Sequence, residues 1–580
     1  MNPTEEDLGY IIAILQKRME EGHVETIHEL GLEENSTSMG LTPEDFDRAL
    51  DTLRKAAATL QSEVTVLRRR EVEFGQVGEV LVRKRPSVET LMEVRVAVVG
   101  NVDAGKSTML GVLTRGTLDN GRGKARLNMF RHKHETETGR TSSISHEIMG
   151  FNAVGEINNY EDQHKISWVD VCEKSSKIIT FIDLCGHEKY LKTTVFGLTG
   201  CAPDFVMLMV GANHGVIGMT KEHLGLALAL NVPVFIVVTK IDMCPPNILQ
   251  ETLRQLTKIL KSPGCRKVPL LVNTSDDVIT MSRNFVSERI CPIFQVSNVT
   301  GQNLDLMRQF LNLLPLHKHF NVNAPFEFQI DDTFLVPGVG AVVAGTVMSG
   351  SVRCGDTVLV GPDSLGSFFP VQIKSCHRKR VSVEGVSAGH SASFALKKVK
   401  RSQVRKGMIL VAKDSSPPKA CIEFEAEILV LFHSTTISTR YQAMTHCDNV
   451  RQTAGIVAMD REILRTGDRA KLRMQFLRHP EYLKIGSRVL FREGRTKAVG
   501  KVSRVIPLGT NEPLSFIPAV PTIRKGGFRE ESSEDHAGSE VTTALLPGDA
   551  FPQEEEVGVV SGLASSSSFS TFSASVKGTN

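Results

Sequence analysis

The chain has 580 residues, of which 41% are hydrophobic and 23% charged, a composition that excludes a collagen-like or wholly disordered chain and predicts several domains. Its net charge of +3 hides an asymmetry: residues 1–321 carry a net −3, residues 322–506 a net +12, and residues 507–580 a net −6. We expect the basic segment to bind a polyanion.

Targeting and redox signals are weak in this sequence. The ten cysteines are scattered without a CxxC pair, so no zinc ribbon is indicated and reduced cysteines are expected. The polar N-terminus does not resemble a signal peptide. The longest apolar stretch, residues 224–238, is interrupted by Asn231 and Pro233 and falls short of the roughly 18–20 residues that span a bilayer. We therefore expect a cytoplasmic protein with no membrane partner.

Residues 1–90 are predicted to form a helical N-terminal extension. Apolar residues between Leu8 and Met19 recur at helical spacing. Thr42 and Pro43 form a helix start, and the apolar spacing after them predicts a helix that runs to about Arg69. Such a helix could dock a partner, but we favour packing on the main body.

Residues 91–320 are predicted to form an α/β domain. Short continuous apolar runs alternate with helical segments, as is typical of strands that are buried on both faces of a parallel sheet. The predicted strands are residues 96–99, 178–182, 205–210, 234–238 and 293–296.

The rest of the chain changes in character. Short β-rich runs separated by Gly, Pro and Asp predict two closed β-barrels, residues 321–415 and 416–508. Residues 509–580 contain acidic clusters and a Ser-rich end, and we expect this low-complexity tail to be disordered.

A phosphate-binding motif opens the α/β domain. Residues 100–107 match GxxxxGK[ST], follow a predicted strand and lead into a helix, which is the context that the motif requires. Backbone N–H groups would wrap the phosphates, with Lys106 on the β- and γ-phosphates and Ser107 on Mg²⁺. The predicted nucleotide-binding residues here are Asn101, Val102, Asp103, Ala104, Gly105, Lys106, Ser107 and Thr108.

Three further loops follow predicted strands. Asp183 can hold the Mg²⁺ shell through water, and Gly186 can sense the γ-phosphate. Asp242, in the loop that also holds Thr239 and Lys240, can accept from guanine N1–H and the exocyclic amine, a donor pair that adenine lacks. This predicts GTP over ATP. The third loop holds Ser297 and Asn298, which would close over the base, with an ordinary turn as the alternative.

A γ-phosphate-sensing Mg²⁺ ligand is expected between the phosphate-loop helix and Trp168. Thr141 is the candidate, and by chemistry alone Thr138, Ser142 and Ser143 are rivals.

These motifs, in this order and ahead of two predicted barrels, resemble the translational GTPases of the elongation factor Tu and elongation factor 1A type over about residues 94–506. The strings at 100–107, 130–135, 139–143 and 186–190 are similar to those of the GTP-binding protein 1 and GTP-binding protein 2 subfamily.

The resemblance implies a GTPase that hydrolyses GTP to GDP and phosphate with Mg²⁺. Its catalytic residues would be His187, which would orient the attacking water, Thr141, as the switch Mg²⁺ ligand, and Lys106. Two positions depart from the elongation factors: Thr239 replaces an Asn that would bind the base and brace the phosphate loop, and Arg140 replaces an apolar gate beside His187 and could contact phosphate or RNA.

The resemblance also implies that the barrels bind aminoacyl-tRNA and that the ribosome triggers hydrolysis, with no DNA partner. The candidate RNA-binding residues are Arg378, Lys379, Arg380, Arg440, Arg492 and Arg495, and residues 397–401 form another basic cluster. For any single one of these residues, a solvated barrel face is an equal explanation.

We therefore predict a carrier of aminoacyl-tRNA that acts on ribosomes in elongation, in rescue of stalled translation and in RNA surveillance. The alternative is a regulatory GTPase switch that recruits RNA-decay machinery or other effectors without carrying tRNA. A metabolic GTPase subunit would not need the basic barrels.

Overall fold

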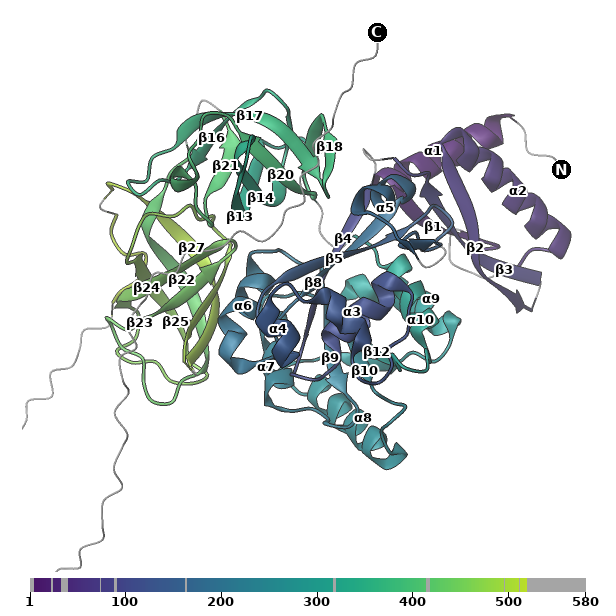
Figure 1. Cartoon of the computed structure of the whole chain (residues 1–580), viewed down its shortest axis with the longest axis horizontal. Helices are drawn as coiled ribbons and strands as arrows, with labels where there is room; N and C mark the ends of the chain where they lie inside the picture. The colour runs from purple at the N-terminus through teal and green to yellow at the C-terminus, as the bar shows by residue number, and fades with distance from the viewer. Residues whose placement is uncertain are drawn as a thin grey trace, which may run out of the picture. The chain divides into compact units, whose positions relative to one another are not determined.

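The computed structural model describes residues 5–21, 24–32, 40–73, 75–87, 91–161, 164–316, 320–413, 418–494, 496–510 and 512–518. They form an N-terminal module, an α/β domain and two β-barrels (Figure 1), so the predicted fold class is confirmed. Most of the predicted disordered tail, residues 519–580, lies outside the described residues.

The N-terminal module packs two helices on a three-stranded antiparallel sheet. Thr42 caps the second helix by accepting from the Asp45 backbone N–H (3.2 Å), and the buried Phe46 and Leu50 of this helix pack with Val80 and Val82 of the sheet. The elements are α1 (Glu5–Glu21), β1 (Glu25–Leu30), α2 (Pro43–Thr59), β2 (Ser62–Val72) and β3 (Gly75–Lys84), with strand order β1-β3-β2.

The prediction that the second helix runs to about Arg69 is wrong. The two predicted helices are present, but α2 ends at Thr59 and residues 62–72 form β2 instead. Val64, Thr65 and Val66 are β-branched, and such residues favour strands. The helical spacing of Leu60 and Val64 was therefore coincidental.

A buried ionic network joins the module to the α/β domain. The Arg83 guanidinium of β3 donates to Glu25 Oε2 (2.7 Å) and Asn312 Oδ1 (2.7 Å), and Lys177 Nζ donates to Glu25 Oε1 (2.7 Å). Both cationic side chains are fully buried. The extension packs on the main body, as we favoured.

The α/β domain is built on a seven-stranded sheet of order β11-β12-β10-β9-β4-β8-β5, parallel except for β5. Its strands are β4 (Met92–Gly100), β5 (Ser145–Phe151), β8 (Lys177–Asp183), β9 (Phe205–Gly211), β10 (Val234–Thr239), β11 (Val268–Leu271) and β12 (Ile290–Gln295), and a small hairpin pairs β6 (Tyr160–Glu161) with β7 (His164–Lys165). The helices and 3₁₀ turns are α3 (Lys106–Arg115), η1 (Lys124–Met129), α4 (Lys133–Thr138), α5 (Trp168–Lys174), η2 (Glu188–Tyr190), α6 (Leu191–Thr199), α7 (Gly218–Ala229), α8 (Pro246–Leu260), α9 (Ser275–Asn284), η3 (Phe285–Ser287) and α10 (Leu304–Leu313).

Helices cover both faces of this sheet. Val96 and Val98 of β4 pack with apolar residues of α3, α9 and α10, whereas Ala97 and Val99 pack with those of α6, α7 and α8. The strand is therefore apolar on both sides, which explains the continuous apolar runs in the sequence. The loops at the carboxyl ends of the parallel strands lie at one edge of the sheet, where ligands bind in open α/β folds.

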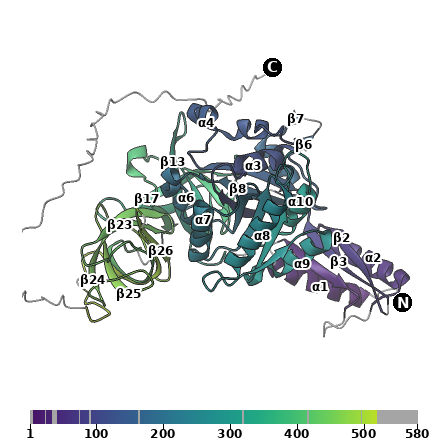
Figure 2. The same cartoon turned by 90° about the horizontal axis from the view of Figure 1, so that it is seen from below.

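Each of the two barrels closes from six strands. The first has the order β16-β21-β13-β14-β20-β17 and closes through β16–β17, and the second has the order β22-β25-β24-β23-β26-β27 and closes through β22–β27. Figure 2 looks into the second barrel. The first comprises β13 (Glu327–Val336), β14 (Gly340–Ser349), β16 (Thr357–Gly361), β17 (Phe369–Arg378), β20 (Ser391–Leu396) and β21 (Ile409–Ala412), with β15 (Ser351–Arg353), β18 (Val381–Val383), β19 (Gly385–Ser387) and η4 (Arg401–Gln403) beside it. The second comprises β22 (Cys421–Phe432), β23 (Gln442–Cys447), β24 (Val450–Met459), β25 (Arg469–Phe476), β26 (Arg488–Glu493) and β27 (Thr496–Pro507).

Within the part of the chain that the structure describes, no helix is both long enough and apolar enough to cross a membrane.

Candidate functional site

The predicted phosphate loop leaves β4 and enters α3 as a tight turn. Gly100 has a φ of +145°, and a Cβ atom there would lie 2.3 Å from the Met209 carbonyl oxygen. Gly105, at the N-cap of α3, has a φ of +80°. Both positions therefore require glycine. The Gly100 N–H donates to Nδ1 of the buried His223 (3.1 Å), which ties the start of the loop to α7.

Lys106 is buried within this loop. Its Nζ donates to the carbonyl oxygens of Gly100 (3.2 Å) and Asn101 (2.8 Å). Burial lowers the pKa of Lys106, while the Asp183 charge opposes that shift. Gly186 lies against the same ammonium group, since a Cβ on Gly186 would be 2.4 Å from Lys106 Nζ. Any side chain at position 186 would displace the lysine.

Three oxygen-bearing side chains from separate segments meet at the start of α3. Ser107 Oγ donates to Asp183 Oδ2 (2.6 Å) and lies 3.0 Å from Thr141 Oγ1. Burial raises the pKa of Asp183 to about 6, although the Ser107 hydrogen bond and the Lys106 charge oppose the rise. Asp183 Oδ1 is buried and has no hydrogen-bond partner among the described residues.

The rivals of Thr141 bond elsewhere. Thr138 Oγ1 donates to the His134 carbonyl oxygen (2.7 Å), and the hydroxyls of Ser142 and Ser143 donate to Glu135 Oε1 (2.7 and 3.1 Å). Of these four candidates, only the Thr141 hydroxyl lies beside Ser107, so its role as a Mg²⁺ ligand stays a prediction that the geometry favours over its rivals.

His187 follows Gly186 at the rim of the pocket. Its Nδ1 accepts from the Lys189 backbone N–H (3.1 Å), so the neutral ring carries its proton on Nε2. The ring makes an edge contact with Tyr190 at a centroid distance of 6.2 Å.

The predicted base-binding loops lie beside the phosphate loop. The Thr239 hydroxyl donates to the Ala104 carbonyl oxygen (3.0 Å), so it braces the phosphate loop although it is not an Asn. Ser297 Oγ accepts from the backbone N–H groups of Val299 (3.2 Å) and Thr300 (3.0 Å) and shapes its own loop. A Cβ on Gly105 would lie 3.8 Å from Asn298 Nδ2.

The remaining predicted base contacts are Lys240 and Asp242. Lys240 has a positive φ of +62°, which places a bend at the end of β10. Asp242 is exposed, so its carboxylate is free to face a ligand. These positions are compatible with the predicted role, which stays a prediction.

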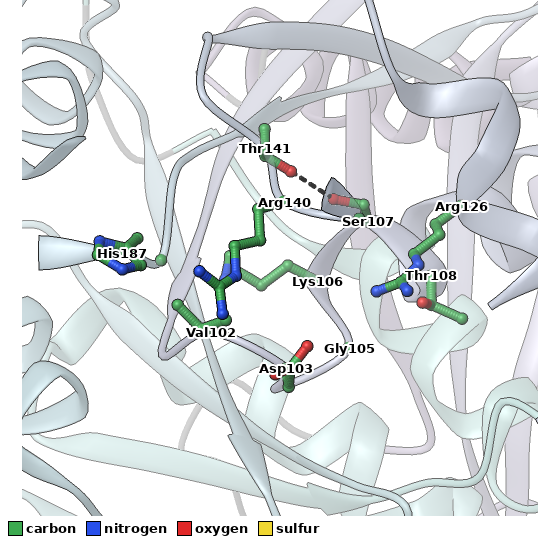
Figure 3. Close-up of a pocket in the computed structure, with 12 residues that line it drawn as sticks. Val102, Asp103, Gly105, Lys106, Ser107, Thr108, Arg126, Arg140, Thr141 and His187 are labelled. Carbon is green, nitrogen blue, oxygen red and sulfur yellow. Dashed lines mark hydrogen bonds between the residues drawn. The ribbon is translucent and has the colours of Figure 1, made fainter. Parts of the chain in front are cut away.

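Figure 3 shows the pocket formed by the phosphate loop together with η1 and the segments at residues 139–141 and 186–187. Two arginines, Arg126 of η1 and Arg140, line it together with His187 and Thr141 (Figure 3). Its other lining residues are Val102, Asp103, Gly105, Lys106, Ser107, Thr108, Gly139 and Gly186. Arg126 belongs to no nucleotide-binding motif, so the sequence assigned it no role. For Arg140, the sequence allowed a contact with either a nucleotide phosphate or RNA.

Glu135 organises the backbone next to the pocket, a role that no sequence motif indicated. Its carboxylate accepts from the backbone N–H groups of Arg131 (2.9 Å), His132 (3.2 Å), Ser142 (2.7 Å) and Ser143 (3.1 Å). Burial raises the pKa of Glu135, but these hydrogen bonds and those of the serine hydroxyls outweigh it and lower the pKa to about 2. Glu135 therefore holds the segment that carries Arg140 and Thr141.

Three of the predicted RNA-binding residues are engaged at domain interfaces, which corrects the picture of one basic surface. Arg378 is buried and donates to the Leu91 carbonyl oxygen, and Lys379 pairs with the buried Glu93 (2.7 Å). Arg492 pairs with Glu222 of α7 (2.7 Å). These contacts join the barrels to the α/β domain in this structure, and Lys379 also supplies the cationic partner that the buried Glu93 carboxylate needs.

The other predicted RNA-binding residues differ in their surroundings. Arg380 is exposed and lies over the Trp168 ring (4.6 Å). Arg440 is exposed and has a φ of +70°. Arg495 lies outside the described residues. In the basic cluster at residues 397–401, all four cationic side chains are exposed.

The site is that of a P-loop GTPase: a strand leads into a glycine loop with a buried lysine, and a serine, an aspartate and a threonine converge beside it. The two closed barrels that follow place the chain in the elongation factor class. Two family models agree with this class. The elongation factor Tu GTP binding domain matches residues 92–316, and elongation factor Tu domain 2 matches residues 340–411.

Full-length relatives narrow the class. GTP-binding protein 1 of Xenopus laevis is 53% identical over 97% of this chain and 86% of its own length. GTP-binding protein 2 of Homo sapiens is 47% identical over 88% of this chain and 86% of its own length. The chain belongs to the family of GTP-binding proteins 1 and 2 within the elongation factor Tu-type GTPases, and it hydrolyses GTP.

More distant relatives share the architecture. Elongation factor 1-alpha of Pyrococcus horikoshii is 24% identical over 65% of this chain and 88% of its own length. The solved structure of elongation factor SelB from Methanococcus maripaludis with the GTP analogue GppNHp superposes with a TM-score of 0.50 at 19% identity, covering 72% of this chain and 80% of that one. This last likeness concerns the fold.

Proposed function

We propose that the protein, in its GTP form, binds aminoacyl-tRNA and delivers it to ribosomes in the cytoplasm, in elongation or in the rescue of stalled translation and RNA surveillance. The observation that carries the proposal is the order of parts: a GTP site is followed by two closed barrels whose strands lie within a segment of net charge +12. Relatives named as elongation factors have matching sequences.

The convergence of Ser107, Thr141 and Asp183 fits Mg²⁺. The ion prefers hard oxygen ligands, and the buried, unpartnered Asp183 Oδ1 supplies an acceptor without a donor. Mg²⁺ is usually held by one or two protein oxygens together with water and substrate phosphates, so Ser107, Thr141 and Asp183 offer enough oxygens. Bound there, Mg²⁺ would neutralise charge on the β- and γ-phosphates.

The other groups of the pocket would each take a separate part in GTP hydrolysis. Backbone N–H groups of the phosphate loop and Lys106 would bind the phosphates, and Thr141 would sense the γ-phosphate. His187, with its proton on Nε2 when neutral, would turn into the pocket and orient the attacking water. Because His187 lies at the rim of the pocket, its position supports a mechanism in which a bound partner moves the imidazole into place before hydrolysis.

RNA would bind the cations that the domain interfaces leave exposed. Lys397 and Lys398 border a hollow of about 320 Å³ on the first barrel, which Gln372 and Gln403 also line. Lys397 Nζ donates to Gln372 Oε1 (3.0 Å), which orders the lysine. Ammonium and amide groups at one hollow suit a phosphate backbone. Arg440 on the second barrel would extend this surface.

Filter binding tests the proposal. The purified chain is titrated with aminoacylated and deacylated tRNA, with GppNHp or GDP, at several salt concentrations. We expect preference for aminoacylated tRNA only with GppNHp. Lys398→Ala should reduce the steepness of the salt dependence by about one, whereas Lys471→Ala, on the second barrel beside Glu427 (3.6 Å), should not. Equal binding in both nucleotide states, or none, would overturn the carrier proposal.

A further inference from the structure

Arg126 and Arg140 add two positive charges to the phosphate pocket beyond that of Lys106. Arg140 points into the pocket toward the phosphate loop, and Arg126 lies on the side of Thr108 (Figure 3). Neither guanidinium has an ion-pair or hydrogen-bond partner among the described residues. Unpaired arginines on a protein surface are ordinary, but these two line the pocket predicted to hold a triphosphate.

The segment that carries Arg126 is fixed to the helix of the phosphate loop. Asp119 accepts from the backbone N–H groups of Gly121, Gly123 and Ala125, each at 3.0 Å. A Cβ on Gly111 of α3 would lie 2.2 Å from the Ala125 carbonyl oxygen. Because position 111 has no side chain, η1 packs directly on α3.

The segment that carries Arg140 is fixed in two ways. Glu135 holds both of its flanks through the four backbone hydrogen bonds described above. Gly139 packs against the other arginine, since a Cβ there would lie 3.0 Å from Arg126 Nη2. Arg126 thus supports the backbone of residue 139, and Arg140 follows directly. Hydrogen bonds to Asp119 and Glu135 therefore fix the backbone of the two segments that carry these arginines.

We propose that Arg140 is a catalytic residue for GTP hydrolysis, supplied by the chain itself, and that Arg126 is a positioning residue that holds it over the phosphates. In the reaction, the water oxygen forms a bond to the γ-phosphorus and the bond from that phosphorus to the β–γ bridging oxygen breaks. Negative charge builds on the leaving β-phosphate, and the water proton passes to inorganic phosphate. Arg140 stays protonated throughout and donates hydrogen bonds to the oxygens on which charge develops.

This assignment extends the established GTPase reaction and does not depend on tRNA binding. An arginine beside the transferring phosphoryl group, supplied in cis or in trans, can accelerate hydrolysis by roughly 10³–10⁵. Arg140 could instead contact only an RNA phosphate, and an assay without RNA separates the two roles.

The test is single-turnover GTP hydrolysis by the full chain without tRNA or ribosomes, together with the affinities for a fluorescent GTP analogue and GDP. We expect Arg140→Ala to slow hydrolysis by roughly tenfold or more while nucleotide affinity changes by less than about threefold. Arg140→Lys should remain slow, because an ammonium lacks the planar fork. Added guanidinium ion should restore part of the rate in Arg140→Ala.

The matched control is Lys133→Ala, which removes a cation from the same segment at a side chain that is 93% exposed. It should hydrolyse GTP at the wild-type rate. Arg126→Ala should slow hydrolysis as Arg140→Ala does, but guanidinium should not rescue it, and hydrogen exchange in residues 137–141 should rise. Wild-type turnover in Arg140→Ala would overturn the proposal, as would a loss of rate explained entirely by lost GTP affinity.

Discussion

Thr239 can perform only one of the two roles of the Asn that it replaces: it braces the phosphate loop but has no amide to bind the base. Its hydroxyl donates to the Ala104 carbonyl oxygen (3.0 Å) and lies 3.4 Å from that of Val210, so it braces the phosphate loop from the end of β10. A threonine has no amide with which to bind the base as well. We therefore expect the recognition of guanine to depend on Asp242 and the loop at Ser297.

Thr239→Val should weaken the binding of GTP and GDP alike. The change keeps the shape of the side chain but leaves the Ala104 carbonyl oxygen unpaired, which costs about 1–2 kcal/mol, or roughly 5- to 30-fold in affinity. Stopped-flow dissociation of a fluorescent nucleotide measures this. Thr300→Val, in the loop after β12, serves as the control. An unchanged rate of nucleotide dissociation in Thr239→Val would mean that the hydrogen bond from Thr239 to Ala104 does not contribute to nucleotide affinity.

At the scale of elements, the segment from α4 to β5 is organised by one carboxylate. Glu135→Gln should disorder residues 131–143 and reduce stability by about 2 kcal/mol, because an amide oxygen accepts these bonds less strongly than a charged carboxylate. Hydrogen exchange in this segment should rise. Glu137→Gln, on the exposed side of α4, should leave exchange unchanged, and equal exchange in both variants would contradict the role of Glu135.

The same residue has a predictable pH dependence. Its pKa lies at about 2 in the folded protein and near 4.5 in the unfolded chain, so its contribution is fully present above about pH 4.5 and is lost as the pH falls toward 2. The difference in Tm between the wild type and Glu135→Gln should be constant from pH 5 to 8 and shrink below about pH 4. A difference that grows on acidification would contradict this sign.

The N-terminal module should behave as part of the GTPase body. Glu25→Gln leaves Arg83 and Lys177 buried without their shared carboxylate, a kind of change that costs about 3–5 kcal/mol. The Tm should fall by several degrees. Glu63→Gln, which breaks an exposed pair with Arg85 in the same module, should change the Tm little. If both variants have a Tm close to that of the wild type, the network of Glu25, Arg83 and Lys177 does not stabilise the contact between the module and the α/β domain.

The sequence predicts what is local and misses what is distant. Residues 100–107 carry their own glycines and lysine, and Asp183 follows its own strand, so these parts are readable from short motifs. The helix expected to reach Arg69 fails because helical spacing over a few apolar residues can also arise within a strand.

Long-range pairs leave no local signal. Glu222 and Arg492 are 270 positions apart, and no pattern in either segment marks their contact. Arg126 reaches the phosphate pocket only because η1 packs on α3. Thr141 is preferred over Ser142 and Ser143 only because the hydroxyls of both serines bond to Glu135, and no sequence pattern shows these contacts.

At the scale of the whole molecule, the cations of residues 322–506 fall into two groups: some lie at contacts between domains, and others are exposed to solvent. Some cations of the +12 segment, including Arg378, Lys379 and Arg492, hold the barrels against carboxylates or carbonyls of the α/β domain. Others, at residues 397–401 and at Arg440, face solvent. If the proposed RNA binding holds, we expect only the exposed set to steepen its salt dependence, so the net charge of the segment overstates the RNA-binding surface.

The central claim, that a ribosome completes this GTPase when it receives the GTP-bound protein with aminoacyl-tRNA, is tested most directly by single-turnover hydrolysis on ribosomes with a vacant acceptor site. We predict that hydrolysis accelerates by several orders of magnitude only when aminoacyl-tRNA is present. His187→Ala should bind GTP normally and lose this acceleration. Ribosomes that fail to stimulate hydrolysis, or that stimulate it equally without tRNA or in His187→Ala, would contradict the account.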